Sequence, residues 1–419
     1  MEINTQESPA KKAILPFYLT AAFSFLLINI LTVYSVEKFT NHFFQPALLA
    51  ITHLAVLGWG TMIIIGASNQ LIPVVAEKKL YSNNLPVICF TLLLPGICLI
   101  VHSFWNFQLS LGMYIGAFMV LCALIMHSVN MFITSRRTAK SNVAIDFIMT
   151  AHAWLVMTAV LGIVLLLNLR FGFLQADNLH YLRLHATLGM VGWFLLLVIG
   201  VSSRLLPMFL LSRTENKTYL NISWYLINSG LSLFFMEGLI FNSCIGKPLY
   251  TGIILSGVLF YLAYIRVCFI SALRKKLDGG MKQTLLAIGF TTIPFFLVVV
   301  SNLYIKDAPS SLIIGYGYSF FAGFISTLIM GQTFKTLPFI IWMHKTNSGK
   351  KSALQPKDLY KEKLVLLQML LYMIGFSLFL CGVLLKGTYL MYTGSAITTF
   401  AALLYFGHVV YLMGKLRIV

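Results

Sequence analysis

The sequence predicts an all-α integral membrane protein of twelve transmembrane helices, built as three pseudo-symmetric repeats of four helices. Of its 419 residues, 59% are hydrophobic and only 10% are charged. With a mean hydropathy of +0.86, this composition is typical of membrane proteins and excludes a soluble domain. Apolar runs of about 20 residues, enough to cross a bilayer, begin near Ala13, Ala47, Leu85, Leu109, Val143, Tyr181, Tyr219, Tyr250, Gln283, Ser311, Leu364 and Tyr389.

The repeats are indicated by a glycine and proline pattern that returns three times. Its first copy is Gly58-Trp59, Gly66 and Pro73, with the second glycine eight residues after the first and the proline seven residues later. The same spacing recurs at Gly192-Trp193, Gly200 and Pro207, and at Gly323-Phe324, Gly331 and Pro338. On an α-helix these positions fall within an arc of about 80°. We therefore predict repeats at 1–140, 141–280 and 281–419, which together form one membrane domain.

The basic residues predict the orientation of the chain. Its net charge is +18, but most of the 30 Lys and Arg residues lie in alternate loops, which the positive-inside rule assigns to the cytoplasm. The exceptions are Lys38, Arg170, Arg183, Lys247, Lys306 and Lys386. This distribution predicts a multi-pass protein of a bacterial inner membrane with both termini cytoplasmic, and it argues against nucleic-acid binding. The first apolar run lacks the features of a cleaved signal peptide, so we expect it to be retained as a span.

A long polar side chain precedes each proline of the pattern by three residues: Gln70, Arg204 and Lys335. We expect these residues at the cytoplasmic, C-terminal ends of their helices, where Arg204 and Lys335 would interact with the negative end of the helix dipole. An entry point for protons or anions is the alternative.

Histidines are the main candidates for chemistry, because ionisable groups inside a membrane are costly. His53 and His185 lie near the expected outer ends of the two helices that contain Gly-Trp, and His152 lies inside the fifth span. A neutral imidazole has one nitrogen able to bind iron or copper; a hydrogen bond to a neighbouring helix is the alternative. The six cysteines form neither C-x-x-C nor C-x-x-C-H, so we predict no disulfide, cysteine metal site or covalent haem.

The twelve spans, the three repeats and the histidines of spans 2 and 6 resemble the catalytic subunit of haem-copper oxidases and nitric oxide reductases. They also resemble its shorter relatives, including nitric-oxide-response membrane proteins proposed to hold haem and copper. The resemblance implies that His53 is an axial haem ligand and that His185 is a copper ligand. Spans 7 and 10 supply further histidines in that family; here span 7 has none, and span 10 has Tyr316 and Tyr318 instead. A complete binuclear centre is therefore not expected, nor is oxygen or nitric oxide reduction at respiratory rates.

Our first hypothesis is a reduced site holding a b-type haem, alone or with copper or another metal ion. The candidate ligands and haem contacts are His53, His185, His152 and Tyr318, with Arg170 and Arg183 as partners of the haem propionates. The role would be electron transfer, or the sensing or handling of nitric oxide or oxygen. If the protein is an enzyme, it would be an oxidoreductase; its partners would be membrane lipid and a redox protein or respiratory-complex subunits. The alternative is a cofactor-free transporter, channel, or assembly or partner subunit of a respiratory complex.

Overall fold

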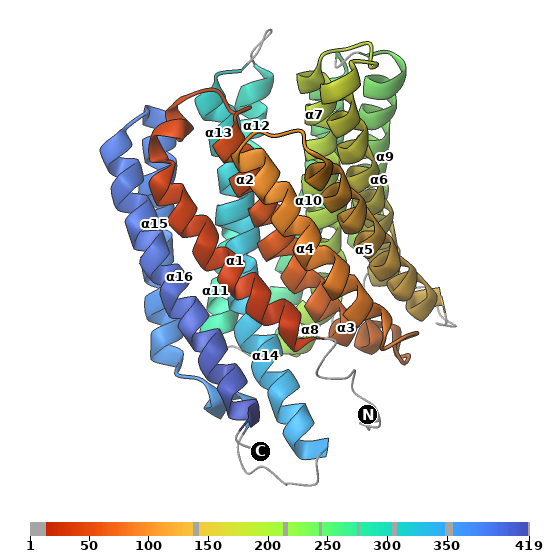
Figure 1. Ribbon diagram of the computed structural model, residues 1–419. Helices are drawn as coiled ribbons and strands as arrows, with labels where there is room; N and C mark the ends of the chain where they lie inside the picture. Colours follow the sequence, from red (N-terminus) through yellow and green to blue (C-terminus); the bar gives the residue numbers. More distant parts are fainter. Residues whose placement is uncertain are drawn as a thin grey trace. The chain divides into compact units, whose positions relative to one another are not determined.

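The computed structural model describes residues 14–136, 142–212, 217–242, 245–274, 277–303, 308–347 and 355–417 (Figure 1). These residues form helices and contain no β-strand apart from one isolated bridge between Ser212 and Ala272. The helices of the first half are α1 (Leu15–Tyr34), α2 (Pro46–His53), α3 (Met62–Ala76), α4 (Leu85–Trp105), α5 (Leu111–Arg136), α6 (Val143–Phe171), α7 (Asn178–Thr187) and α8 (Leu196–Leu210). Those of the second half are α9 (Thr218–Ile240), α10 (Lys247–Ile270), α11 (Gly279–Phe290), α12 (Thr292–Asn302), α13 (Ser310–Tyr318), α14 (Thr327–Asn347), α15 (Glu362–Leu385) and α16 (Thr388–Arg417).

Eleven helices of the described residues are long and apolar enough to cross a membrane. They comprise α1, α4, α5, α6, α10, α15 and α16, together with the composite helices Pro46–Ala76, Asn178–Leu210, Gly279–Asn302 and Ser310–Met343. The chain is therefore a multi-pass helical membrane protein. The seventh expected span coincides with α9, a helix of 23 residues that is not among the eleven.

Each helix that carries the glycine pattern contains a π-helical segment of eight residues. These segments are η3 (Leu54–Thr61), η4 (Leu188–Leu195) and η5 (Ser319–Ser326). Each begins four residues before the first glycine of its pattern, at Gly58, Gly192 and Gly323 respectively. A π segment holds one more residue than the α-helical turn it replaces, and such segments are frequent at functional sites. The recurrence at the same place in three helices supports the interpretation of the pattern as a repeat.

The prolines of the pattern do not end their helices, contrary to expectation. Pro73, Pro207 and Pro338 lie inside α3, α8 and α14. The helix α14 continues for nine residues beyond Pro338, to Asn347. Lys335 is therefore an interior residue of its helix, and the expectation that it interacts with the helix end is wrong. The physical reason is that a proline costs one backbone hydrogen bond, which a membrane helix can replace locally.

The chain divides into two compact units. Unit 1 comprises Met1–Gln70, Ile97–Gln108 and Leu277–Val419, and unit 2 comprises Leu71–Gly96 and Leu109–Lys276. The division falls within α3 and α4, so unit 1 contains α1, α2, η3 and α11 to α16, and unit 2 contains α5 to α10. This grouping neither supports nor contradicts the predicted repeat boundaries.

Aromatic side chains hold the core of unit 1 together. Trp59 of η3 is fully buried, stacks on Phe25 of α1 and meets the edge of Tyr405 of α16. Its indole Nε1–H donates to the hydroxyl of Ser326 in η5 at 3.0 Å. The π segments η3 and η5 therefore pack directly on each other. The helix α16 packs against both α1 and α15 (Figure 1).

In unit 2, α6 is the helix on which α8 and α9 converge. A Cβ atom placed on Gly192 would lie 2.6 Å from Cβ of Trp154, and one on Gly200 would lie 2.8 Å from Cβ of Phe147. Small residues thus let η4 and α8 approach α6 closely, as is typical of membrane helices. Polar contacts join α6 to α9: Trp154 Nε1–H donates to Asn228 Oδ1 at 3.1 Å.

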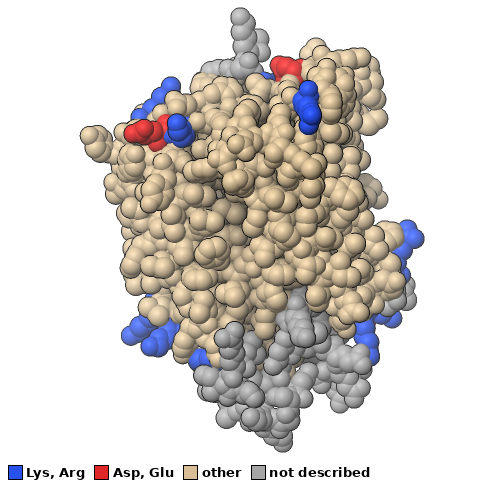
Figure 2. Space-filling model, in the orientation of Figure 1, with Lys and Arg blue, Asp and Glu red and all other residues tan. Residues whose placement is uncertain are grey.

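The charged side chains lie where a membrane protein requires them. On the face drawn in Figure 2, Lys and Arg side chains lie near the top and the bottom, Asp and Glu side chains lie near the top, and uncharged residues cover the surface between. This part of the surface thus avoids the cost of placing charge in hydrocarbon.

Candidate functional site

His53 is the last residue of α2, directly before the π segment η3. Its Nδ1 lies 2.8 Å from the carbonyl oxygen of Leu49, and its half-buried ring stacks on Phe104 of α4 with 4.5 Å between ring centroids. A carbonyl oxygen only accepts hydrogen bonds, so Nδ1 carries the proton and the neutral ring has its lone pair on Nε2. A metal-binding histidine is commonly oriented in this way, by a carbonyl on its other nitrogen.

His185 has the same tautomer but a partner on another helix. It belongs to α7, and its Nδ1 lies 3.0 Å from the carbonyl oxygen of Thr158 in α6. Gly162, one turn further along α6, makes room for the ring: a Cβ atom at that glycine would lie 3.0 Å from Cε1 of His185. The ring is thus positioned by α6, with its lone pair on Nε2.

His152 forms a buried pair with His127. Both side chains are almost completely buried, with 2% and 3% exposed, and their Nε2 atoms are 3.3 Å apart. The Nδ1 of His152 donates to the carbonyl of Ile148 at 2.7 Å, so its Nε2 must accept a hydrogen bond from Nε2–H of His127. Trp193 packs against His152 in a T-shaped contact, with 5.3 Å between the ring centroids.

The sequence identified His152 as a candidate but gave His127 no role. A signal was nevertheless available: His127 lies nine residues before the end of α5, and His152 nine residues after the start of α6. In two antiparallel helices joined by a short connection, such residues lie at the same depth.

Tyr318 lies in an aromatic and aliphatic cluster of unit 1. Its ring stacks on Phe376, with 5.5 Å between centroids, and lies 4.7 Å from the centroid of Phe379. It packs against a buried cluster that includes Ile51 of α2, which lies two residues before His53 and hence nearly on the opposite side of that helix. These contacts place Tyr318 and His53 in different surroundings, which argues against their binding the two faces of one haem.

Arg170 and Arg183 are both exposed residues of unit 2, at the end of α6 and in α7. The guanidinium of Arg170 lies over the rings of Tyr114 and Phe171 at 5.9 and 5.6 Å. Their exposure is compatible with binding an anionic group, but no contact of the described residues selects haem propionates.

The residues of the predicted site divide between the two units. His53 and Tyr318 belong to unit 1, whereas His152, His185, Arg170 and Arg183 belong to unit 2. Within the described ranges, no group of three or more His, Cys, Asp or Glu side chains is arranged to hold a metal ion. The described residues thus include two single histidines, His53 and His185, and one histidine pair.

Comparison with known proteins identifies the fold. No protein-family model and no curated protein matches the sequence. Solved structures do match it; one is a haem-copper terminal oxidase dimer studied by electron cryo-microscopy. The likeness has a TM-score of 0.69 at 11% sequence identity, over 96% of this chain and 84% of that chain. The chain thus has the fold of that oxidase chain.

Proposed function

We propose that this protein is a haem-copper oxidase-like inner-membrane protein that binds one b-type haem through His53. Its role is electron transfer, or the sensing or handling of nitric oxide or oxygen, rather than that of a conventional terminal oxidase. The observation that carries the proposal is the orientation of His53, whose Nδ1 faces the carbonyl of Leu49 so that Nε2 bears the lone pair. The oxidase fold supports it.

The residues around His53 fit a haem held by one protein ligand better than one held by two. Tyr318, the candidate second ligand, packs against Phe376 and Phe379. Neither α9 nor the segment from α13 to η5 contains a histidine. A haem with one histidine ligand supplies one-electron chemistry and a position for a diatomic gas. The chain's own contribution is to hold the imidazole of His53 in one tautomer and, through Phe104, in one ring plane.

Optical spectroscopy of protein purified from a haem-replete host tests the proposal. We expect a b-type spectrum that changes on reduction with dithionite and has a high-spin character, because His53 is the single protein ligand. His53→Gly should lose the Soret band, and added imidazole should restore it by occupying the space of the missing ring. Imidazole rescue separates loss of the ligand from loss of the fold.

The matched control is His102→Ala. His102 lies in α4 but is exposed, next to Asn106. This variant should keep the wild-type spectrum. A colourless wild-type protein, or a Soret band unchanged in His53→Gly, would contradict the proposal and favour a cofactor-free transporter, channel or partner subunit.

A further inference from the structure

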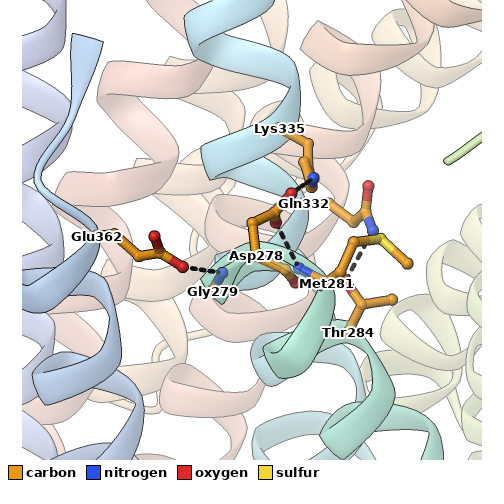
Figure 3. Close-up of polar contacts among 8 residues, drawn as sticks. Asp278, Gly279, Met281, Thr284, Gln332, Lys335 and Glu362 are labelled. Carbon is orange, nitrogen blue, oxygen red and sulfur yellow. Dashed lines mark hydrogen bonds and ion pairs between the residues drawn. The ribbon is translucent and has the colours of Figure 1, made fainter. Parts of the chain in front are cut away.

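The helices α11, α14 and α15 of unit 1 meet at the start of α11, where the carboxylates of Asp278 and Glu362 lie (Figure 3). Asp278 caps α11 by accepting from Met281 N–H at 3.1 Å, and it forms an ion pair with Lys335 of α14. Glu362 of α15 accepts from Gly279 N–H at 2.9 Å. Carboxylates are favoured at this position by the positive end of the helix dipole.

The same end of the unit includes Tyr360, whose pKa is raised by burial and in part by these carboxylates. Burial, followed by the negative charges of Asp278 and Glu362, raises the pKa of Tyr360 to about 12. The ring of Tyr360 contacts Phe334 of α14. This end of the three-helix junction thus carries ion-paired and neutral polar groups.

Inside this end, α11 and α14 are in backbone contact. A Cβ atom at Gly331 would lie 2.8 Å from the carbonyl oxygen of Gly280. The hydroxyl of Thr284 donates to that carbonyl at 2.9 Å and accepts from Nε2 of Gln332 at 2.8 Å. Because the hydroxyl proton is already used, Thr284 can only accept from Gln332, and the amide of Gln332 has one possible orientation.

Gln368 of α15 is fixed in the same way. Its Nε2 donates to the sulfur of Met330, next to Gly331, at 3.2 Å. A thioether sulfur is only an acceptor, so Oε1 of Gln368 points elsewhere. The side chain is completely buried, with 0% exposed.

Gln283 faces α15 from α11. Gly279, one turn earlier on the same face, has Val365 and Leu366 as its neighbours across the interface. Gln283 is also completely buried, with 0% exposed. The contacts thus place Gln332 beside Thr284, Gln368 beside Met330, and Gln283 on the side of α11 that faces α15.

Four polar atoms of these amides have no hydrogen-bond partner among the described residues: Oε1 of Gln332, Oε1 of Gln368, and both Oε1 and Nε2 of Gln283. In a membrane interior each unsatisfied group costs several kcal/mol. Buried polar groups in native proteins are satisfied by protein or by ordered water. A partner other than the described residues is therefore required here.

The orientations decide the chemistry of that partner. The carbonyl oxygens of Gln332 and Gln368 need hydrogen-bond donors or a cation, which excludes an anion. Gln283 needs a donor and an acceptor at once, which a bare cation does not provide. Water meets every requirement, because it donates and accepts.

We propose that Gln283, Gln332 and Gln368 form a buried water-binding site in unit 1, which solvent reaches from the end marked by Asp278, Lys335 and Glu362. The site is built on α11, α14 and α15 and does not depend on His53 or on a haem.

Cysteine accessibility tests the site directly. Gln283→Cys is compared with Ala287→Cys, one turn further on the same face of α11 and equally buried, with 0% exposed. The probe is methyl methanethiosulfonate, which reacts with thiolates and so requires water at the sulfur. We expect labelling, followed by peptide mass spectrometry, to be at least tenfold faster at position 283. Equal rates, both slow or both fast, would overturn the proposal.

A second pair of cysteine variants tests the site if one of the first two variants does not fold. Gln368→Cys is compared with Val365→Cys, which is equally buried and lies nearer the charged end. The expected order is again faster labelling at the glutamine position, and the reverse order would contradict a site at the amides.

Thermal unfolding of Gln283→Leu gives an independent readout. Leucine should lower the melting temperature if it removes a partner of bound water, whereas a rise would show that the amide was simply unsatisfied. The wild type should melt at the same temperature in sodium, potassium and choline chloride of equal ionic strength. Specific stabilisation by sodium or potassium would assign a cation instead and overturn the assignment to water.

Discussion

Three intramembrane histidines present the same nitrogen to a backbone carbonyl. Nδ1 faces Leu49 in the case of His53, Ile148 for His152 and Thr158 for His185. The sequence predicts neutral imidazoles with one nitrogen available. In all three rings Nδ1 contacts a carbonyl oxygen, and in His152 the second nitrogen also has a partner, His127. The sequence does not predict which group each ring meets, because Thr158 and His127 lie on other helices and their contacts depend on helix rotation.

The His127–His152 pair carries the first residue-scale prediction. His152→Ala should lower the free energy of unfolding by about 2–4 kcal/mol, because it leaves a cavity and removes the partner of a buried imidazole. Unfolding in detergent, followed by circular dichroism, measures the change. The exposed His102→Ala is the control and should change stability by less than about 0.5 kcal/mol. Equal stability of wild type and His152→Ala would show that the pair is not a structural contact.

Gly162 provides a second test at this scale. Gly162→Val adds a branched side chain where even a Cβ atom would lie 3.0 Å from Cε1 of His185. The ring must move, which breaks its hydrogen bond to Thr158, and we expect a loss of about 1–3 kcal/mol. Gly252→Val is the control, since nothing lies within 4 Å of a Cβ atom there. A similar loss in both variants would point to helix propensity rather than to the imidazole.

At the scale of helices, the second glycine of each pattern lies at a close contact between helices. Gly66 packs on Phe17, Gly200 on Phe147 and Gly331 on Gly280, in each case on the helix that precedes in the chain. The π segments could not be foreseen from the sequence. An extra residue rotates the side chains that follow it by about 100° around the helix axis, relative to a regular α-helix. A uniform period of about 3.6 residues therefore assigns residues on the two sides of a π segment to the wrong faces.

The contact between α11 and α14 gives the element-scale prediction. In Gly331→Ala the added Cβ would lie 2.8 Å from the carbonyl oxygen of Gly280 and 3.1 Å from the amide nitrogen of Thr284. Backbone atoms cannot give way as a side chain does, so we expect a loss of about 2–4 kcal/mol, measured by thermal unfolding. Gly317→Ala, in the same composite helix but with nothing within 4 Å, should be neutral or stabilising. An unchanged melting temperature for Gly331→Ala would contradict the close approach.

At the scale of the whole molecule, hydropathy predicted a multi-pass helical protein, and the resemblance predicted the fold that the solved oxidase shares at 11% identity. This agreement is possible because span length and small-residue packing are set by the bilayer, and many sequences satisfy both. The ligand set is not constrained in that way, since a single substitution removes a ligand without disturbing a helix. Span 10 illustrates this, because it has Tyr316 and Tyr318 where the resemblance implies histidines. The fold was therefore predictable, whereas the site was predictable only as residue types.

The topology prediction concerns α9, whose hydropathy falls below that of the eleven helices that are long and apolar enough to cross a membrane. Two of its polar side chains pair with α6: Trp224 Nε1–H donates to Thr150 at 3.3 Å, and Asn228 accepts from Trp154 at 3.1 Å. Because paired groups cost little in a membrane, α9 can cross with a lower hydropathy than an isolated helix needs.

We therefore predict that α9 crosses the membrane and that the chain has twelve spans. A green fluorescent protein reporter fused after Lys217 should fluoresce, because this position is cytoplasmic, and alkaline phosphatase fused after Gly246 should be active, because that position is external. Fusions after Glu77 and Gln108, on either side of α4, are the controls and should read cytoplasmic and external. If both positions around α9 read cytoplasmic, α9 lies on the membrane surface. The helices from α10 onward would then run in the opposite direction, and their basic connections would face outward, against the distribution of Lys and Arg that predicts the orientation.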